Sequence, residues 1–499
     1  MYPADRAKRA ALALSFANLV YLRVWFDLLA GASRTSDIKH PAAPSDYCAG
    51  LCNLLLLAAA VWYCLSLSSR MPGWLQQALV FAGLLLVVNA IRGVAAAYTP
   101  LLRSGIFRYL SPKASIVLAG LTACAGVYLL AHYFSRAAVL LRVGLLACLS
   151  AVPVTCGLAV VRLVFPPSVP VDPPLAARLE SLSHRPRVIW AIFDEWDNRL
   201  SFVARPKGID LKALDLLVSR SFVGTHVLGP QGRIPLPFMA TQVAIPALLG
   251  GETRTADDYH APNLFSMAHA RGSNVAIGGW YIPYCRLFAS DAFRCYWDQM
   301  YTQSTAQGGS FANALAIQNR SLFETSMFSV FGQSVTSKSH AAEFRALRDF
   351  ALDAVSDPAA SLVFLHFNAP HAPYFFDAKS GRFDAAGRGI NGYPDALELV
   401  DQTVAQLVER LDSNSVLILS ADHPLRNADQ LDGATDPHVP FIVHFPGQTK
   451  PLREEQEFSS IRTAPLILQI LDGKVRTPED ADEFLEAEFR SRSTGPSTH

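Results

Sequence analysis

Five long apolar stretches fill the first third of the chain and constrain its fold more than any other feature. They cover residues 10–31, 49–68, 75–97, 115–134 and 138–165. Each approaches or exceeds the roughly 20 apolar residues that a helix needs to cross about 30 Å of hydrocarbon. The stretches therefore predict a bundle of five transmembrane helices over residues 1–165.

The charges around these stretches bear on their orientation. A basic segment with Arg6, Lys8 and Arg9 precedes the first stretch, and no small-residue cleavage site follows it. We therefore expect a retained helix with a cytoplasmic N-terminus, not a removed signal peptide. Basic residues between positions 103 and 113 count against this orientation. An odd number of spans places the rest of the chain outside the cytoplasm.

The remainder of the chain has the composition of a soluble domain. The whole chain is 51% hydrophobic, but its long apolar runs all lie before residue 166. The prolines of FPPSVPVDPP cannot continue a helix and indicate a linker over residues 166–186. We expect a soluble domain over residues 187–490 and a disordered tail over 491–499. A net charge of +1 without a basic cluster indicates no nucleic-acid partner.

Short apolar runs alternate with helical patterns in the soluble domain. The strand candidates are RVIWAIFD, NVAIGGW, SLVFLHF, SVLILSAD and PFIVHF. Continuous apolar strands separated by helices predict an α/β fold with a doubly wound, mostly parallel sheet. In such sheets the ligand site lies beyond the carboxyl ends of the strands. The residues that follow the strands are therefore the first candidates for a functional site.

Acidic and imidazole side chains lie at the ends of three of these strands. They are Asp194 and Glu195 at the first strand, His366 and His371 at the third, and Asp422 and His423 at the fourth. Carboxylate oxygen and imidazole nitrogen are ligands for zinc and similar divalent ions. Each residue taken alone could be a helix cap or a satisfied core group. Their shared sheet edge favours a metal site.

A threonine within PLPFMATQVAIPALLGGE supplies a candidate nucleophile. Thr241 opens a helical pattern, so its side chain and the backbone N–H groups can face an anion at the helix N-terminus. The alternative is that Thr241 only caps the helix. A hydroxyl is a poor nucleophile until a metal or a base activates it. The predicted metal site would provide that activation.

The segment TQVAIPALL resembles the nucleophile segment of the alkaline phosphatase superfamily. This superfamily includes sulfatases, phosphodiesterases and the bacterial phosphoethanolamine and phosphoglycerol transferases. Residues Thr241 to Pro246 match the T-x-x-S-V-P pattern of the transferases, with Ala244 in place of the serine. Sulfatases carry a Cys or Ser that becomes formylglycine at the Thr241 position. Because threonine cannot yield formylglycine, the resemblance implies phosphoryl rather than sulfuryl chemistry.

Two further segments resemble the metal ligands of the same superfamily. FDEWD is similar to the first metal-binding strand end, which implies Glu195 as the ligand and Asp194 as a possible second one. SADH is similar to the Asp-His ligand pair, which maps onto Asp422 and His423, although Pro424 replaces the usual glycine. With Thr241, the resemblance implies a divalent metal site, with Zn²⁺ first and Mn²⁺ or Ca²⁺ as alternatives, and it leaves one or two ions open.

Histidines complete the resemblance. LHFNAPHAPY repeats the His-x4-His-x-Pro spacing of the transferases with His366 and His371, and DPHVPFIV places His438 before the last strand. By the resemblance, His371 and His438 contact the phosphoryl oxygens, protonate a leaving group or hold a second ion. His366 is expected to be structural, because it precedes the turn.

The resemblance implies a sulfatase-like catalytic domain on a membrane anchor. The leading hypothesis is transfer of a phosphoethanolamine or phosphoglycerol headgroup from a membrane phospholipid to an envelope glycan or lipid. Thr241 would attack phosphorus and form a phosphothreonine intermediate. The implied location is the bacterial inner membrane, with the catalytic domain on the periplasmic side. Two alternatives stay open: a metal-dependent phosphodiesterase or sulfatase-like hydrolase, and an inactive membrane scaffold.

Two smaller features lead to local predictions. Six of the eight cysteines lie in or beside the apolar stretches, while Cys285 and Cys295 stand alone in the soluble domain. This close pair is either a disulfide or two buried thiols, because spacing does not fix geometry. In the first apolar stretch, Arg23 and Asp27 lie one helical turn apart. We predict an ion pair between them, with a lipid headgroup contact as the alternative.

Overall fold

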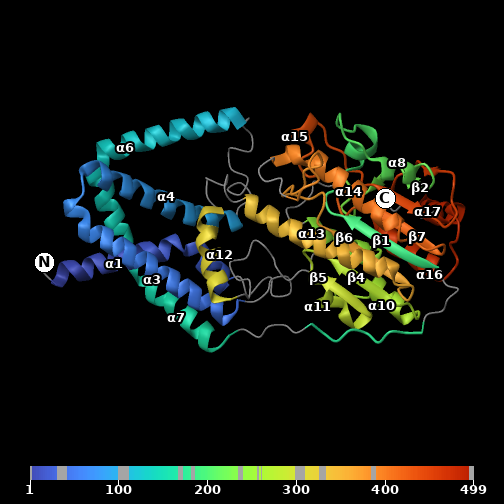
Figure 1. Ribbon diagram of the computed structural model, residues 1–499, viewed down its shortest axis with the longest axis horizontal. Coiled ribbons are helices and arrows are strands. Elements are labelled where there is room, and N and C mark those ends of the chain that lie inside the picture. Colours follow the sequence, from blue (N-terminus) through green and yellow to red (C-terminus); the bar gives the residue numbers. More distant parts are fainter. Residues whose placement is uncertain are drawn as a thin grey trace. The chain divides into compact units, whose positions relative to one another are not determined.

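The computed structural model forms two compact units. One unit comprises residues 1–169 and 300–333, and the other comprises residues 170–299 and 334–499 (Figure 1). The structure describes residues 3–30, 42–98, 112–166, 172–180, 186–233, 240–254, 258–259, 261–297, 310–324, 333–383 and 389–493. The predicted linker and tail lie partly outside these ranges, and the last helix continues to Ser493.

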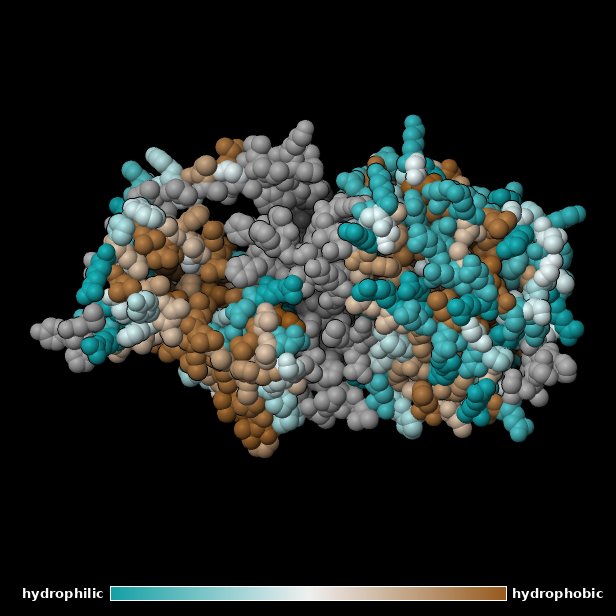
Figure 2. All heavy atoms as spheres, viewed as in Figure 1, coloured by the Kyte–Doolittle hydropathy of each residue, from teal (hydrophilic) through white to brown (hydrophobic). Residues whose placement is uncertain are grey.

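Unit 1 is helical throughout its described part. Its main elements are α1 (Pro3–Val20), α2 (Leu22–Trp25), η1 (Phe26–Ala30), α3 (Pro44–Leu67), α4 (Gly73–Tyr98), α6 (Pro112–Ala147), α7 (Ala151–Val164) and α12 (Phe311–Glu324). Large apolar side chains are exposed on these helices, among them Leu56 on α3, Trp74 on α4 and Leu140 on α6. Figure 2 shows that the surface of α3 and α7 is mainly hydrophobic. Such a surface suits a lipid environment.

The number of candidate spans corrects the prediction of five. Among the described residues, three helices are long and apolar enough to cross a membrane: Pro44–Leu67, Gly73–Val94 and His132–Val164. A fourth is added if the bent pair Asp5–Val20 and Leu22–Leu29 counts as one span. The fourth and fifth predicted spans are not separated by a turn, because α6 runs on through a kink at Tyr133. No Pro or Gly lies between residues 134 and 138 to end the helix there.

The charged residues of the first apolar stretch form the predicted ion pair. Arg23 Nε lies 3.2 Å from Asp27 Oδ2. Arg23 Nη1 also donates to the carbonyl oxygen of Gly93 on α4 over 2.8 Å. A local pair with a backbone partner therefore accounts for this arginine within unit 1.

A polar network ties α12 to the helices near the N-terminus. Asn53 Nδ2 donates to Gln318 Oε1 over 3.2 Å, and Asn319 Nδ2 donates to Asn53 Oδ1 over 2.7 Å. Tyr21 Oη donates to Asn319 Oδ1, and Gln318 Nε2 donates to the backbone oxygen of Asp46. We call Tyr21, Asn53, Gln318 and Asn319 the amide network. The boundaries predicted for the soluble domain did not set α12 apart, although it packs on α3.

Unit 2 is built on an eight-stranded, mostly parallel sheet, as predicted. Its strand order is β5-β4-β6-β1-β7-β8-β2-β9, and β8 runs antiparallel to both of its neighbours. The strands are β1 (Arg187–Phe193), β2 (Phe222–Gly224), β4 (Val275–Gly279), β5 (Arg294–Trp297), β6 (Leu362–Phe367), β7 (Ser415–Ser420), β8 (Phe441–His444) and β9 (Leu452–Glu454). All residues of β1, β6 and β7 are buried, which explains their continuous apolar runs.

Helices cover both faces of this sheet. They include α8 (Lys212–Val218), α9 (Ala240–Gly250), α10 (Leu264–Ala270), α11 (Tyr284–Phe288), α13 (Gln333–Ser356), α14 (Tyr393–Val408), α16 (Thr463–Leu471) and α17 (Pro478–Ser493). Neighbouring residues of a strand point to opposite faces. The glycines of β4 show the two coverings, because a Cβ at Gly278 would meet Phe350 of α13 and one at Gly279 would meet Tyr284 of α11. The mixed α/β fold class is thus confirmed.

The two cysteines of unit 2 are bonded to each other. Cys285 in α11 and Cys295 in β5 form a disulfide with a Cα–Cα distance of 5.6 Å. Of the two alternatives that the sequence left open, the disulfide is therefore the one present. It joins a helix to the edge strand that follows it.

Candidate active site

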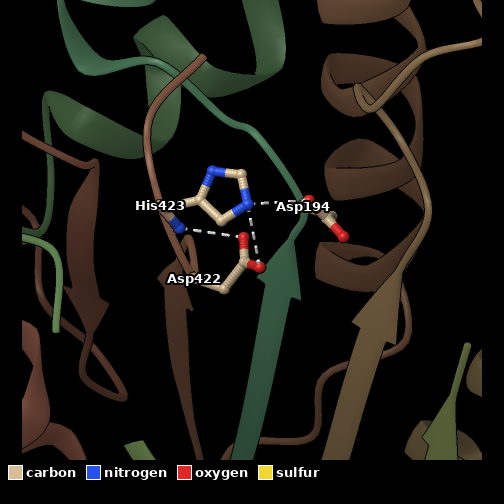
Figure 3. A group of neighbouring side chains, drawn as sticks. All are labelled: Asp194, Asp422 and His423. Atoms are coloured by element: carbon tan, nitrogen blue, oxygen red, sulfur yellow. Dashed lines mark hydrogen bonds and ion pairs between the residues drawn. The ribbon is translucent and has the colours of Figure 1, made fainter. Parts of the chain in front are cut away.

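Two adjacent parallel strands carry the centre of the site. In the register of β1 with β7, Ile192 lies opposite Ser420, so Asp194 and Asp422 leave the sheet side by side. Figure 3 shows both carboxylates turned toward the ring of His423. His423 Nε2 lies 3.6 Å from Asp194 Oδ1 and 3.5 Å from Asp422 Oδ2. We call these three buried residues the Asp–Asp–His group.

Thr241 meets this group from the first turn of α9. Its Oγ1 lies 2.8 Å from Asp422 Oδ2, 3.3 Å from Asp194 Oδ2 and 3.5 Å from His423 Nε2. The side chain is 7% exposed, so water competes little for the hydroxyl. The structure thus brings together four of the residues singled out in the sequence, from three separate elements. A hydroxyl held in this way suits a nucleophile beside a cation.

The charges of the Asp–Asp–His group call for a cation. Burial, followed by the charges of Asp422 and Glu195, raises the pKa of Asp194 well above its usual range. Asp194 Oδ1 is buried and has no hydrogen-bond partner in the described part of the chain. Ligand atoms of the three residues all lie within 4.8 Å of one another. Two carboxylates, an imidazole and a hydroxyl fit a divalent ion such as Zn²⁺ or Mn²⁺.

Glu195 points to a different partner. Its backbone has φ 65°, a left-handed conformation that is rare for a residue with a side chain, directly after β1. Its Oε1 accepts from Arg426 Nε over 2.5 Å. Burial opposes ionisation of Glu195, but the charge and hydrogen bond of Arg426 favour it, and the pKa of Glu195 is lowered. Of the two residues that the resemblance implied as ligands, the structure thus groups Asp194, not Glu195, with Asp422 and His423.

His366 in β6 and His371 in the loop that follows it have different neighbours. Arg426 Nη2 lies 2.8 Å from His371 Nε2, and the ring of Trp280 lies 5.3 Å from that of His371. Burial lowers the pKa of His371, which favours the neutral ring. His366 lies behind the Asp–Asp–His group, with Nδ1 2.8 Å from Tyr284 Oη and Nε2 3.9 Å from Asp194 Oδ2. Burial also lowers the pKa of His366, to about 4.

His438 has a separate set of neighbours. Its Nδ1 lies 2.5 Å from Asp436 Oδ1, and its Nε2 lies 3.5 Å from Glu457 Oε2. Its ring meets that of His226 edge-on at 5.4 Å. Within the described ranges we find no direct contact between His438 and Thr241 or the Asp–Asp–His group.

Sequence reasoning did not identify Arg426 or Trp280. Arg426 stands three residues after His423 on the loop that follows β7, and Trp280 directly follows β4. Both strands end at the sheet edge where the ligand site was expected. A search of every strand end for arginine and aromatic residues would have found them.

The chain is similar to one protein family and to several solved structures. The sulfatase family model matches residues 242–473, a range that starts directly after Thr241 and includes Asp422 and His423. No curated protein matches the chain. One similar solved structure is Ps i-CgsB in complex with k-i-k-neocarrahexaose, at 14% identity and a TM-score of 0.40, covering 62% of this chain and 77% of that one.

Two other solved structures have similar scores. The lipoteichoic acid synthase LtaP from Listeria monocytogenes shows 12% identity and a TM-score of 0.39, covering 58% of this chain and 72% of that one. The phosphonate monoester hydrolase of Agrobacterium radiobacter shows 13% identity and a TM-score of 0.38, with coverage of 58% and 74%. The match of the sulfatase family model over residues 242–473 agrees with the resemblance of the chain to the alkaline phosphatase superfamily.

Proposed function

We propose that the protein is a membrane-anchored, metal-dependent phosphotransferase. It moves a phosphorylated headgroup, of the phosphoethanolamine or phosphoglycerol type, from a membrane phospholipid to an envelope glycan or lipid. One observation carries the proposal: the Thr241 hydroxyl lies against a buried Asp–Asp–His group at the carboxyl edge of the sheet. The apolar helices of unit 1 support a lipid donor, because they would hold the enzyme at the bilayer.

The chemistry follows from the residues that surround Thr241. A divalent ion held by Asp194, Asp422 and His423 would lower the pKa of the hydroxyl and neutralise the carboxylates. Asp422 Oδ2 accepts the hydroxyl hydrogen bond and fixes the direction of the oxygen. Thr241 Oγ1 attacks phosphorus as the bond to the diacylglycerol oxygen breaks, which leaves the headgroup on the threonine. An acceptor hydroxyl then displaces Thr241 from the phosphorus.

The identity of the nucleophile favours phosphoryl transfer over sulfate hydrolysis. Sulfatases use formylglycine, which threonine cannot form, while a threonine oxygen can carry a phosphoryl group as a stable ester. The sulfatase-family match supports a second candidate, in which water replaces the acceptor and the enzyme is a phosphodiesterase. Both candidates share the first half of the reaction.

The location is part of the proposal. We place unit 2 on the periplasmic side of a bacterial inner membrane. The Cys285–Cys295 disulfide supports this placement, because disulfides persist in oxidising compartments. Labelling of an introduced surface cysteine with a membrane-impermeant reagent in intact spheroplasts checks it, and labelling only after lysis contradicts it.

Mass spectrometry of Thr241 tests the reaction. The full-length protein in lipid nanodiscs, loaded with Zn²⁺ or Mn²⁺, is given phosphatidylethanolamine or phosphatidylglycerol with an isotopically labelled headgroup. We expect a labelled headgroup phosphate on the peptide that contains Thr241, and none in Thr241→Ala. Incorporation of ¹⁸O from water into released headgroup phosphate distinguishes the hydrolase. Full turnover by Thr241→Ala overturns both candidates, and an inactive scaffold shows neither adduct nor turnover.

A further inference from the structure

The acidic residues at the ends of β1 and β7 fall into two groups. Asp194 and Asp422 face His423 and Thr241, whereas Glu195 turns away through its left-handed backbone. The Tyr393 hydroxyl holds this turn by donating to the Glu195 carbonyl oxygen over 2.8 Å. A second charged group therefore lies beside the Asp–Asp–His group.

Arg426 occupies the centre of this second group. Its Nε donates to Glu195 Oε1 over 2.5 Å, and its Nη2 lies 2.8 Å from His371 Nε2. A guanidinium has no acceptor, so His371 Nε2 must accept and the ring proton must sit on Nδ1. Glu195 and His371 offer a carboxylate oxygen and an imidazole nitrogen, which are the donors that a metal ion uses. Both of these donor atoms are directed at the guanidinium instead.

We propose that the Arg426 guanidinium is the second cation of the active site and keeps a second metal ion out. The proposal rests on the proposed function, which needs a positive charge beside Thr241. Arginine keeps its charge at every working pH, unlike a site that must bind an ion from solution. His371 is then a neutral hydrogen-bond donor through Nδ1, and not a metal ligand through Nε2.

The charge count leads to a substrate class. Three buried carboxylates, one divalent ion and one guanidinium leave the site neutral before the substrate binds. An ester with a single negative charge then adds one uncompensated charge to the site, and an ester with two negative charges adds two. Each such charge costs more free energy where water is excluded. The structure therefore favours a phosphodiester over a phosphate monoester. This class includes the headgroup linkage of a phospholipid.

A metal count on the purified full-length protein tests the exclusion directly, without reference to turnover. The protein in detergent is equilibrated with excess Zn²⁺, desalted and analysed by plasma mass spectrometry. We expect one zinc per chain in the wild type and in Arg426→Lys, which keeps a cation at this position. We expect two in Arg426→Ala, because Glu195 and His371 lose their partner. Adding His371→Ala to Arg426→Ala should restore one.

The outcomes separate this proposal from the proposed function. Two zinc ions in the wild type, or one in a folded Arg426→Ala, overturn the role of Arg426 and leave the phosphotransferase proposal intact. No zinc in the wild type, with none retained from expression, argues against the metal-dependent reaction itself. Thermal unfolding confirms that the variant is folded. If Arg426→Ala does not fold, Arg426→Gln removes the charge in its place, and two zinc ions in the wild type overturn the proposal without any variant.

Substrate charge gives a second readout. The probes are bis-p-nitrophenyl phosphate, p-nitrophenyl phosphate and p-nitrophenyl sulfate. We expect the wild type to prefer the phosphodiester, and Arg426→Ala to lose about tenfold or more of this preference over the monoester, because charge-assisted bonds are among the strongest in a site. A preference for the monoester in the wild type contradicts the charge argument. A preference for the sulfate ester, which also carries one negative charge, would mean that the substrate is a sulfate ester. It would contradict the assignment of a phosphodiester.

Discussion

The amide network of unit 1 and the Asp–Asp–His group of unit 2 are both buried and polar, but they differ in charge. The amides of the network are neutral, and Asn53 donates to Gln318 and accepts from Asn319. In the Asp–Asp–His group, two carboxylates lie side by side, and one oxygen of Asp194 has no hydrogen-bond partner among the described residues. The amide network satisfies its polar groups by hydrogen bonds alone, whereas the Asp–Asp–His group needs a cation to balance its carboxylates. Buried polar side chains therefore indicate a functional site where their charges are not balanced by one another.

Loss of the Thr241 hydroxyl should have the largest effect of all. We expect Thr241→Ala to lower headgroup release by about 10³-fold or more, because removal of a covalent nucleophile costs that much or more in related mechanisms. Thr241→Ser keeps the hydroxyl and should retain part of the activity. The measurement is release of labelled headgroup from phospholipid in nanodiscs. Equal activities of the Ala and Ser variants would show that the hydroxyl does not react.

Metal removal should affect the Asp–Asp–His group and leave the amide network unchanged. At a free metal concentration about 1,000 times the dissociation constant, binding stabilises the folded state by about 4 kcal/mol. We therefore expect a chelator to lower the melting temperature of the wild type at pH 8. Asp422→Asn should show little response to the chelator, because it has lost a ligand. Asn53→Leu should respond as the wild type does.

The strand ends of unit 2 could be predicted from the sequence, whereas contacts between distant residues could not. The apolar strands of unit 2 predicted the sheet, and strand ends predicted the meeting of Asp194, Asp422 and His423, because parallel strands end at one edge. The partner of Glu195 was not predictable, since a left-handed turn depends on distant contacts such as that from Tyr393. The resemblance ranked Glu195 ahead of Asp194 as a ligand, whereas the backbone turn at Glu195 leaves Asp194 as the carboxylate that joins Asp422 and His423.

Unit 1 was less predictable for a related reason. Apolar runs show that a helix can lie in lipid, but they do not show where a helix ends when no Pro or Gly interrupts it, as at α6. The position of α12 depends on side-chain pairing between residues more than 260 positions apart, such as Asn53 and Gln318. No local pattern carries such information.

A buried carboxylate without a paired cation should show its cost as a pH effect. Asp197 is fully buried, its Oδ1 accepts from Leu200 N over 2.8 Å, and burial raises its pKa to about 6. Because the folded-state pKa exceeds the unfolded value of about 4, the folded protein loses stability as the pH rises from about 4 to about 6. Asp197→Asn keeps an acceptor for Leu200 and removes the charge.

We expect Asp197→Asn to stabilise unit 2 by about 1–2 kcal/mol at pH 8 and to have little effect at pH 4. Chelator-treated protein is used for the comparison, so that metal binding does not add its own pH dependence. The check is thermal unfolding of the variant and the wild type at both pH values. A variant that is destabilised equally at both would mean that the hydrogen bond, and not the charge, dominates at this position.

The amide network should give the smallest effect on the reaction, because its members are neutral and none belongs to the Asp–Asp–His group. Asn53→Leu removes the bonds to Gln318, to Asn319 and to the Leu315 carbonyl oxygen and puts an apolar side chain in their place. Hydrogen bonds between helices in membranes are worth about 0.6 kcal/mol on average, so three of them predict a loss of about 2 kcal/mol. Leu56→Ala on the exposed side of α3 is the matched control and should change stability less. Zinc content and headgroup release per folded molecule should stay at the wild-type level in Asn53→Leu. If zinc content falls as well, the two buried polar groups are coupled, and the division between a structural network and a functional one does not hold.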